Sequence, residues 1–181
     1  MKVIATDIPD VMVLEPRVFR DERGFFMESY NRRSFKQATG VDAQFVQDNT
    51  SFSVRNVVRG LHYQIQQVQG KLIQVMAGEV FDVAVDLRRG SRTFKQWVGV
   101  RLSGGVPRML WIPEGFAHGF LVLSEHAILL YKTTDYYAPE HERAILWNDP
   151  DLALRWPLQE APIVSEKDRR ASTLRAAEMF D

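Results

Sequence analysis

Residues 71–102 read KLIQVMAGEVFDVAVDLRRGSRTFKQWVGVRL, which is three short apolar runs separated by turn residues. In the middle run, Val80–Leu87, apolar residues alternate with Asp82 and Asp86. This period of two predicts a strand with one buried face. Gly78 marks a tight turn, because glycine takes positive φ at little cost. The stretch therefore predicts three consecutive strands, at Lys71–Ala77, Val80–Leu87 and Thr93–Leu102.

The same pattern of short apolar segments and turns continues on both sides of this stretch. Only two places are typical of helix: Ser34–Thr39, closed by Gly40, and a segment that begins near Ser165. The alanine-rich end, Ala171–Met179, is expected to be helical or frayed. Many strands and few helices favour an all-β sandwich or barrel. The further predicted strands are Val11–Val18, Gly24–Tyr30, Gln44–Phe52, Arg108–Ile112, Gly119–Leu123 and Ala127–Thr133.

Composition limits the classes of protein. A chain of 181 residues with 45% hydrophobic residues can build one substantial core, so we expect a single domain over residues 1–181. Lys plus Arg and Asp plus Glu are both 23, which removes the electrostatic argument for a nucleic-acid partner. The absence of cysteine excludes disulfides and thiolate nucleophiles. With no signal-like or transmembrane apolar run, we expect a cytoplasmic protein without a membrane partner.

Two motifs carry candidate chemistry. The stretch Gly60-Leu61-His62-Tyr63-Gln64, followed by Lys71 and Gly78, and the stretch PEGFAHG at 113–119 resemble the two motifs of the cupin superfamily of small β-barrels. Metal-binding cupins have a second histidine where Gln64 stands and a glutamate where Lys71 stands. Because a cation in place of a carboxylate repels a divalent ion, we expect a barrel without metal or other cofactor.

His62 and Lys71 are the central candidates. On a strand His62 shares a face with Gln64, and the inward faces of a barrel converge on one cavity. A buried lysine is costly unless the cavity holds an anion or a polar ligand. His62 is therefore a candidate base and Lys71 a candidate charge stabiliser. The structural alternative for His62 is a core histidine bonded to a backbone carbonyl.

Over nearly its whole length the chain resembles the dTDP-4-dehydrorhamnose 3,5-epimerases. The resemblance implies a cupin-like double-stranded β-helix, or jelly roll, with a few short helices near the ends. It also implies conversion of dTDP-4-dehydro-6-deoxy-glucose to dTDP-4-dehydro-rhamnose by inversion of C3 and C5, both beside the C4 ketone. The matching stretches are Asp21–Phe26, Gln47–Asn49, Val58–Gln64, Gly70–Leu72, Ile112–Phe120, Tyr131–Lys132, Tyr136–Tyr137 and Ser165–Asp168.

The resemblance also implies a role for each catalytic position. His62 is the base, Asp168 holds it in the useful tautomer, Lys71 stabilises the enolate, and Tyr131 reprotonates carbon from the opposite face. Such chemistry needs a base, a cation at the oxygen and an acid. Structural alternatives remain for two of these residues. Ser165 to Asp168 has the form of a capping box, and Tyr131 fits a buried core aromatic.

The implied substrate-binding residues fall into three groups. Basic side chains meet the diphosphate, since they match phosphate oxygens; solvated surface charge is the alternative for Arg23 and Lys167. A second group reads thymine and sugar edges, and aromatic residues stack on thymine or wall the pocket. A homodimer with strand exchange is expected, in which residues 23, 26 and 28 complete the partner's pocket. The residues of the three groups are Arg23, Arg59 and Lys167; Gln47 and Asn49; and Tyr137 and Phe26; the resemblance implies further substrate-binding positions at Glu28, Asp48, His118 and Glu142.

Three other functions fit parts of the pattern. A relative that epimerises one carbon, or isomerises a keto sugar, would use the same base and acid. A non-catalytic barrel that binds a nucleotide sugar would not need them on opposite walls. A metal-dependent, dioxygenase-like cupin would lose activity with chelators.

Overall fold

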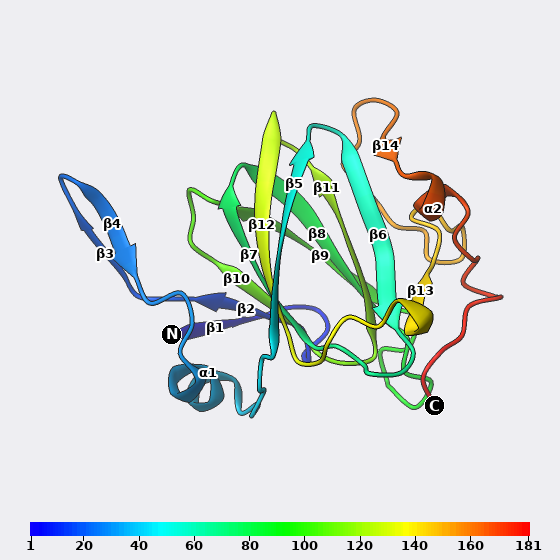
Figure 1. Ribbon diagram of the computed structural model, residues 1–181, viewed down its shortest axis with the longest axis horizontal. Coiled ribbons are helices and arrows are strands. Elements are labelled where there is room, and N and C mark those ends of the chain that lie inside the picture. The colour runs from blue at the N-terminus through cyan, green and yellow to red at the C-terminus, as the bar shows by residue number, and fades with distance from the viewer.

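Two six-stranded sheets face each other in the computed structural model, which describes residues 1–181 (Figure 1). The first sheet has the order β1-β2-β10-β7-β12-β5, and the second has the order β13-β6-β11-β8-β9, with β14 paired to β6. All pairings are antiparallel except that of β14 with β6. The predicted all-β, cupin-like jelly roll is confirmed. The first sheet comprises β1 (Lys2–Ala5), β2 (Met12–Glu15), β10 (Met109–Ile112), β7 (Lys71–Ala77), β12 (His126–Thr133) and β5 (Gln47–Val54); the second comprises β13 (Glu142–Ala144), β6 (Val57–Gln64), β11 (Phe116–Val122), β8 (Glu79–Asp86), β9 (Trp97–Ser103) and β14 (Ile163–Val164).

The main core fills the space between the two sheets. Ile73 and Leu129 of the first sheet and Phe116 and Phe120 of the second belong to one buried cluster. Each such side chain contributes about 1.5–3 kcal/mol when it leaves water. The core therefore occupies the barrel interior, except where polar residues form the cavity described below.

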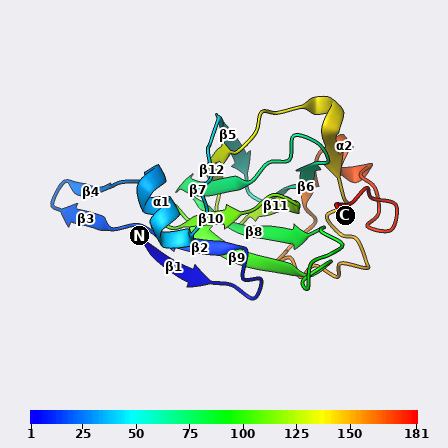
Figure 2. The same cartoon turned by 90° about the horizontal axis from the view of Figure 1, so that it is seen from below.

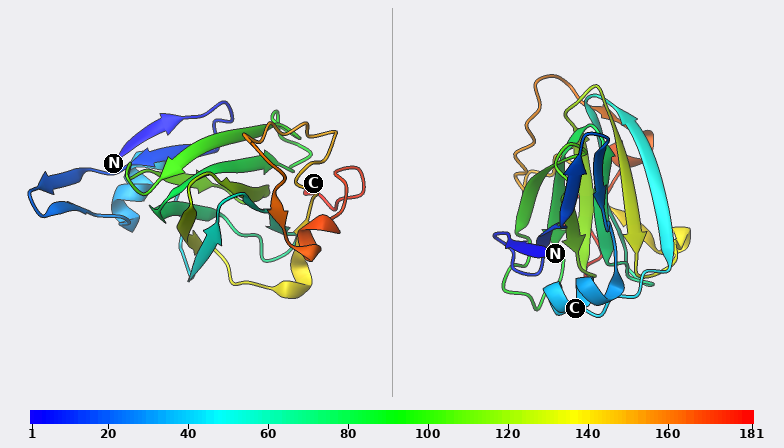
Figure 3. Two further views of the ribbon diagram at one scale, coloured as in Figure 1. Left: turned by 90° about the horizontal axis from the view of Figure 1, so that it is seen from above. Right: turned by 90° about the vertical axis from the view of Figure 1, so that its left-hand side faces the viewer.

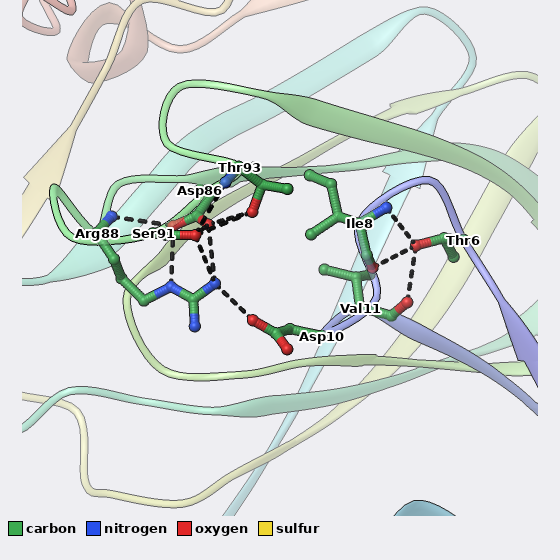
Figure 4. A network of polar contacts seen from close by, with 8 residues as sticks. All are labelled: Thr6, Ile8, Asp10, Val11, Asp86, Arg88, Ser91 and Thr93. Atoms are coloured by element: carbon green, nitrogen blue, oxygen red, sulfur yellow. Dashed lines mark hydrogen bonds and ion pairs between the residues drawn. The ribbon is translucent and has the colours of Figure 1, made fainter.

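Strand β8 differs from the predicted strand with one buried face. Val83, Val85 and their apolar neighbours face outward, where residues 145–180 of the C-terminal segment cover them. Asp82 and Asp86, on the other face, are also fully buried. Asp86 accepts hydrogen bonds from Arg88 and from neighbouring hydroxyls, as Figure 4 shows. Both faces of β8 are therefore buried, because the C-terminal segment covers the outer face as well.

Several predicted strand bounds differ from those in the structure. The predicted strand Val11–Val18 is divided into β2 and β3 (Val18–Asp21) around Pro16, which has no N–H to donate to a ladder. β3 pairs with β4 (Gly24–Met27) in a hairpin that extends away from both sheets (Figure 2). Four strands, β1, β6, β13 and β14, were not predicted with bounds, and one of them, β6, carries His62.

The two α-helices begin at capping residues. α1 (Arg32–Thr39) begins after Asn31, whose side chain accepts hydrogen bonds from two backbone N–H groups, and ends at Gly40 with φ 76°. The predicted helix is confirmed, although it starts two residues earlier than Ser34. α2 (Glu166–Arg169) follows Ser165, and a 3-10 turn spans Pro139–His141. Neither α-helix has the length or apolar character needed to cross a bilayer.

The C-terminal segment is neither helical nor frayed. Residues 171–179 form turns without a helix, and Leu174 is buried. Phe180 exchanges backbone hydrogen bonds with Leu87 and Arg89. The left view of Figure 3 shows this segment, drawn in red, at the end of the molecule opposite the β3–β4 hairpin. Packing against β8 thus overrides the local helix propensity of the alanines.

Candidate active site

One polar cavity lies between the two sheets and contains most of the ionisable groups named above. Its volume is about 250 Å³, and only two of its twelve lining residues are hydrophobic. Residues from β5, β7 and β12 line one side and residues from β6 and β11 line the other. The lining residues are Asn49, Thr50, Ser51, Arg59, His62, Gln69, Lys71, His118, Gly119, Phe120, Tyr131 and Thr133.

His62 is paired with a buried carboxylate. Its Nε2 lies 2.6 Å from Oδ1 of Asp168, and the other carboxylate oxygen accepts the Gly60 N–H at 3.2 Å. Burial opposes ionisation of Asp168, but the His62 hydrogen bond and charge and the Gly60 N–H together lower its pKa. The Nδ1 of His62 makes no hydrogen bond, and no buried side-chain nitrogen lacks a partner, so Nδ1 is open to solvent.

Asp168 has both structural and site contacts. It lies in the first turn of α2, where its backbone N–H donates to Ser165 Oγ at 3.1 Å. This cap fixes the start of the helix, and the same helix holds the carboxylate against His62. The two interpretations of Ser165 to Asp168 therefore coexist.

Gly60 brings the two central strands of the second sheet unusually close. Its φ is 112°, and a Cβ there would lie 2.6 Å from Gly119 Cα. Only glycine at both positions allows this approach without a shift of the backbone. The close contact aims the Gly60 N–H at Asp168 and accompanies a register shift between β6 and β11.

Lys71 projects from β7 into the same cavity. Burial lowers the pKa of its ammonium to about 8, while the negative charges of Glu142 and Asp82 act in the opposite direction. Its Nζ lies 3.5 Å from the carbonyl oxygen of His62, on the facing sheet. The ammonium therefore lies near His62, where it can stabilise a further negative charge in the cavity.

Tyr131 reaches the cavity from β12, in the sheet opposite His62. Its hydroxyl lies 2.9 Å from Ser51 Oγ. Burial raises the pKa of the phenol, so the group stays protonated at neutral pH. Tyr131 is thus a proton donor that faces the cavity, and its partner Ser51 was not among the predicted site residues.

His118 forms a second pair of imidazole and carboxylate. Its Nε2 lies 2.9 and 3.0 Å from the two oxygens of Asp82, and both side chains are buried. His118 was a predicted site residue, whereas Asp82 was predicted only to lie on the polar face of a strand. An isolated aspartate on a strand next to a motif histidine was the available signal.

A rim of polar residues joins five further predicted positions. The Tyr137 hydroxyl donates to Glu142 Oε2 at 2.8 Å, and Lys167 donates to the same oxygen. The Gln47 amide bonds Asn49 and accepts the Tyr137 N–H. The hydrogen bonds from Lys167 and Tyr137 outweigh burial and lower the pKa of Glu142.

Arg59 lies where two hollows meet. It lines the main cavity and also a second hollow of about 430 Å³ behind His62 and Asp168, beside Lys167. Its guanidinium donates to Ser53 Oγ and to the carbonyl of Phe52. Two cations, Arg59 and Lys167, therefore border the second hollow.

Four predicted binding residues lie away from this cavity. Arg23 pairs with Asp21 in the β3–β4 hairpin, and Phe26 in that hairpin is 73% exposed. Glu28 accepts hydrogen bonds from residues at the start of α1. Asp48 points to the other face of β5, where it pairs with Lys132.

The structure contains no group of three or more His, Cys, Asp or Glu side chains that could hold a metal ion. The two cavity histidines each use Nε2 to contact a carboxylate instead. The donor set thus does not match a typical metal centre.

The comparisons with known proteins agree with one another. The model of the family described as dTDP-4-dehydrorhamnose 3,5-epimerase matches residues 5–176. The chain is 63% identical over 180 residues to the dTDP-4-dehydrorhamnose 3,5-epimerase of Pseudomonas aeruginosa, covering 99% of both chains. It is 54% identical to the dTDP-6-deoxy-D-glucose-3,5-epimerase of Legionella pneumophila, whose crystal structure in complex with dTDP-4-keto-L-rhamnose superposes with TM-score 0.95, covering 98% of this chain and 94% of that one. A 3'-monoepimerase from Streptomyces bikiniensis, in complex with dTDP-quinovose, is 34% identical with TM-score 0.89, covering 97% of this chain and 88% of that one.

Proposed function

The chain belongs to the dTDP-4-dehydrorhamnose 3,5-epimerase family, and from this premise we propose how its cavity carries out the reaction. The protein is an isomerase of dTDP-rhamnose biosynthesis. It inverts C3 and C5 of dTDP-4-dehydro-6-deoxy-glucose to give dTDP-4-dehydro-rhamnose. Both carbons lie beside the C4 ketone, so the chemistry is proton removal and return at carbon.

In the proposed mechanism His62 is the base. Its free Nδ1 takes the proton from carbon while Asp168 stabilises the imidazolium that forms. The electron pair moves onto the C4 oxygen, where the Lys71 ammonium stabilises the enolate. Tyr131 then delivers its proton to the opposite face of the same carbon, and both side chains exchange protons with water before the second inversion.

One observation carries this proposal: His62 and Tyr131 enter the same cavity from opposite sheets, and Lys71 lies beside them. A planar enolate bound between the sheets would present one face to the imidazole and the other to the phenol. A binding protein that only senses the nucleotide sugar has no need for this arrangement.

The test is turnover of dTDP-4-dehydro-6-deoxy-glucose in heavy water. Deuterium at both C3 and C5 of the product is expected; deuterium at one carbon alone would instead support the single-position epimerase. The Streptomyces monoepimerase has a similar fold, so the fold alone does not separate these activities.

Two variants test the roles of the side chains. We expect His62→Ala to keep ligand affinity within about tenfold and to lose a factor of roughly 10²–10⁴ in kcat, with a comparable loss for Tyr131→Phe. Tyr63→Phe is the matched control, since Tyr63 is buried outside the cavity and its hydroxyl donates to the Glu178 carbonyl. Full turnover by His62→Ala would refute the mechanism.

For the nucleotide, we propose that the diphosphate lies between Arg59 and Lys167 and that Tyr137 stacks on thymine. The rim contacts support this assignment, since Gln47, Asn49 and Glu142 lie together there. Two cations flanking one hollow suit a dianionic group. His118 would then contact the sugar from the floor of the cavity.

We also propose that the chain, as one domain, forms a cytoplasmic homodimer in which the β3–β4 hairpin completes the partner's pocket. The hairpin extends away from the two sheets (Figure 1). Its Phe19, Phe25 and Phe26 side chains are exposed. The outer face of the first sheet exposes Phe52, Val54 and Met76. Exposed apolar patches of this kind are typical of protein interfaces.

Mixing two inactive variants tests the dimer. His62→Ala lacks the base, and the double variant Arg23→Ala, Phe26→Ala lacks the hairpin contacts. If the hairpin serves the partner, half of the mixed dimers are heterodimers with one intact pocket each, so about a quarter of wild-type activity should return. A monomer by size measurement, or no recovery on mixing, would remove the proposal.

A further inference from the structure

Asp82 is the one buried ionisable group of the cavity region that the proposed mechanism leaves unused. It lies on the inner face of β8, between buried apolar neighbours Val80 and Ala84. A carboxylate in such surroundings is costly unless it is paired. Its contacts therefore indicate why the fold places it there.

The first contact is with His118. Both Asp82 oxygens lie within 3.0 Å of Nε2, so the carboxylate accepts and the ring carries its proton on Nε2. The Nδ1 of His118 makes no hydrogen bond, and no buried side-chain nitrogen lacks a partner, so Nδ1 is accessible in the cavity. His118 is thus oriented with a lone pair toward the space where a sugar would lie.

The arrangement repeats that of His62. His118 and His62 are directly opposed in the β11–β6 ladder, each is held through Nε2 by a buried carboxylate, and each leaves Nδ1 free. The two carboxylates come from different elements, β8 and α2. The cavity therefore has two oriented imidazoles on one wall.

The second contact is electrostatic. Asp82 and Glu142 are the negative charges that favour the protonated form of Lys71. Burial raises the pKa of Asp82, while the His118 interaction and the Lys71 charge oppose that shift. The charged form of each partner thus supports that of the other.

We propose that Asp82 is a positioning residue for the epimerisation: it fixes His118 with its proton on Nε2, so that Nδ1 accepts a hydrogen bond from a sugar hydroxyl, and it keeps Lys71 an ammonium. The proposal rests on the proposed function of this cavity. It assigns Asp82 no contact with the substrate.

The decisive measurement is the pH profile of kcat/KM for Asp82→Asn. Asp82 is one of the two negative charges that favour the protonated form of Lys71, so loss of Asp82 lowers the Lys71 pKa. The alkaline limb of the profile, which reports loss of the ammonium, should move to lower pH. We also expect kcat/KM at neutral pH to fall roughly 10- to 100-fold, the loss typical when an outer carboxylate that orients a functional histidine is removed. The ionisable groups that face Lys71 or share its cavity are Asp82 of β8, Glu142 of β13, Arg59 and His62 of β6, His118 of β11 and Tyr131 of β12.

Asp86→Asn is the matched control, since Asp86 is equally buried on the same strand but bonds Arg88 outside the cavity. It should leave the alkaline limb in place even though it lowers stability. A folded Asp82→Asn protein with the wild-type limb would overturn the inference. A wild-type protein that incorporates no deuterium at C3 or C5 would refute the proposed function itself, and the inference with it.

Nitrogen-15 NMR of the wild-type imidazoles gives a test that needs no altered protein to fold. The chain has only four histidines, so the signals are few. We expect His118 to carry its proton on Nε2 at neutral pH. A neutral ring protonated on Nδ1 would contradict the proposed role of Asp82.

Discussion

Replacement of Asp86 by asparagine should destabilise the protein in a pH-dependent way. Burial opposes the charge of Asp86, but hydrogen bonds from Arg88, Ser91 and Thr93 outweigh it and lower the carboxyl pKa from 3.8 to about 2 (Figure 4). Arg88 also reaches Asp10 at 2.7 Å and lies over the Phe116 ring. The charged carboxylate therefore anchors a turn that closes one end of the barrel.

The magnitude follows from the difference between the folded and unfolded pKa values. The lowering from 3.8 to about 2 corresponds to about 2 kcal/mol at pH 7. Because the folded-state pKa is the lower one, this stabilisation is present above about pH 4 and is lost as pH falls through about 2. The same linkage gives about 1 kcal/mol at pH 3.

Urea unfolding of wild type and Asp86→Asn at pH 7 and pH 3 measures both values. The free energy of unfolding should differ by about 2 kcal/mol at pH 7 and by about half as much at pH 3. The melting temperature at pH 7 should fall by roughly 5–10 °C for a chain of this size. A difference that is equal at both pH values would refute the reasoning, because a purely steric effect of asparagine does not titrate.

Three further predictions concern the cavity. Asp168→Asn should lower kcat roughly 10²-fold or more, because the amide no longer stabilises the His62 imidazolium. Ser165→Ala should instead cost about 1 kcal/mol of stability through loss of the α2 cap. Stopped assays and thermal melts measure the two effects, and equal effects of both variants on kcat would argue against a specific role for the carboxylate. Wild-type kcat/KM should fall as pH rises through about 8, the pKa to which burial lowers Lys71, since the neutral amine no longer stabilises an enolate, and a flat profile to pH 10 would contradict this. Prolonged treatment with a chelator should leave turnover unchanged, and loss of activity that added zinc or iron restores would favour the metal-dependent alternative.

The sequence predicted the fold class well because the relevant information is local. Short apolar runs, glycine turns and the Gly40 cap act within a few residues, so most strands and α1 were found. The errors arise from long-range packing. The face of β8 that carries Asp82 and Asp86 was expected to meet solvent but is buried on the inner side of the sheet, and residues 145–180 cover the apolar outer face. The same contacts hold residues 171–179 in turns where composition favoured helix.

Individual site residues could be predicted only where they belong to recognisable sequence motifs. His62, Lys71, His118 and Tyr131 line one cavity, as expected from their strands. Asp82 and Ser51 are not part of the matching motifs, and their contacts with His118 and Tyr131 become apparent from the pairing of the strands. Arg23, Phe26 and Glu28 lie away from the cavity for a different reason, since their hairpin leaves the body of its own chain.

The balance of charge in the cavity explains why a lysine can occupy the place that a glutamate holds in metal-binding barrels. A metal ion brings its own charge and needs carboxylates, whereas an ammonium on β7 needs a nearby anion to stay protonated in a buried site. Glu142 and Asp82 supply that negative charge, and Asp82 also holds His118. The lysine and the buried Asp82 therefore support each other's charged forms. A charge-reversing change at Lys71 or Asp82 should consequently lower both the stability of the barrel and the turnover in the cavity. Paired neutral changes, such as Lys71→Met with Asp82→Asn, should recover stability without recovering turnover.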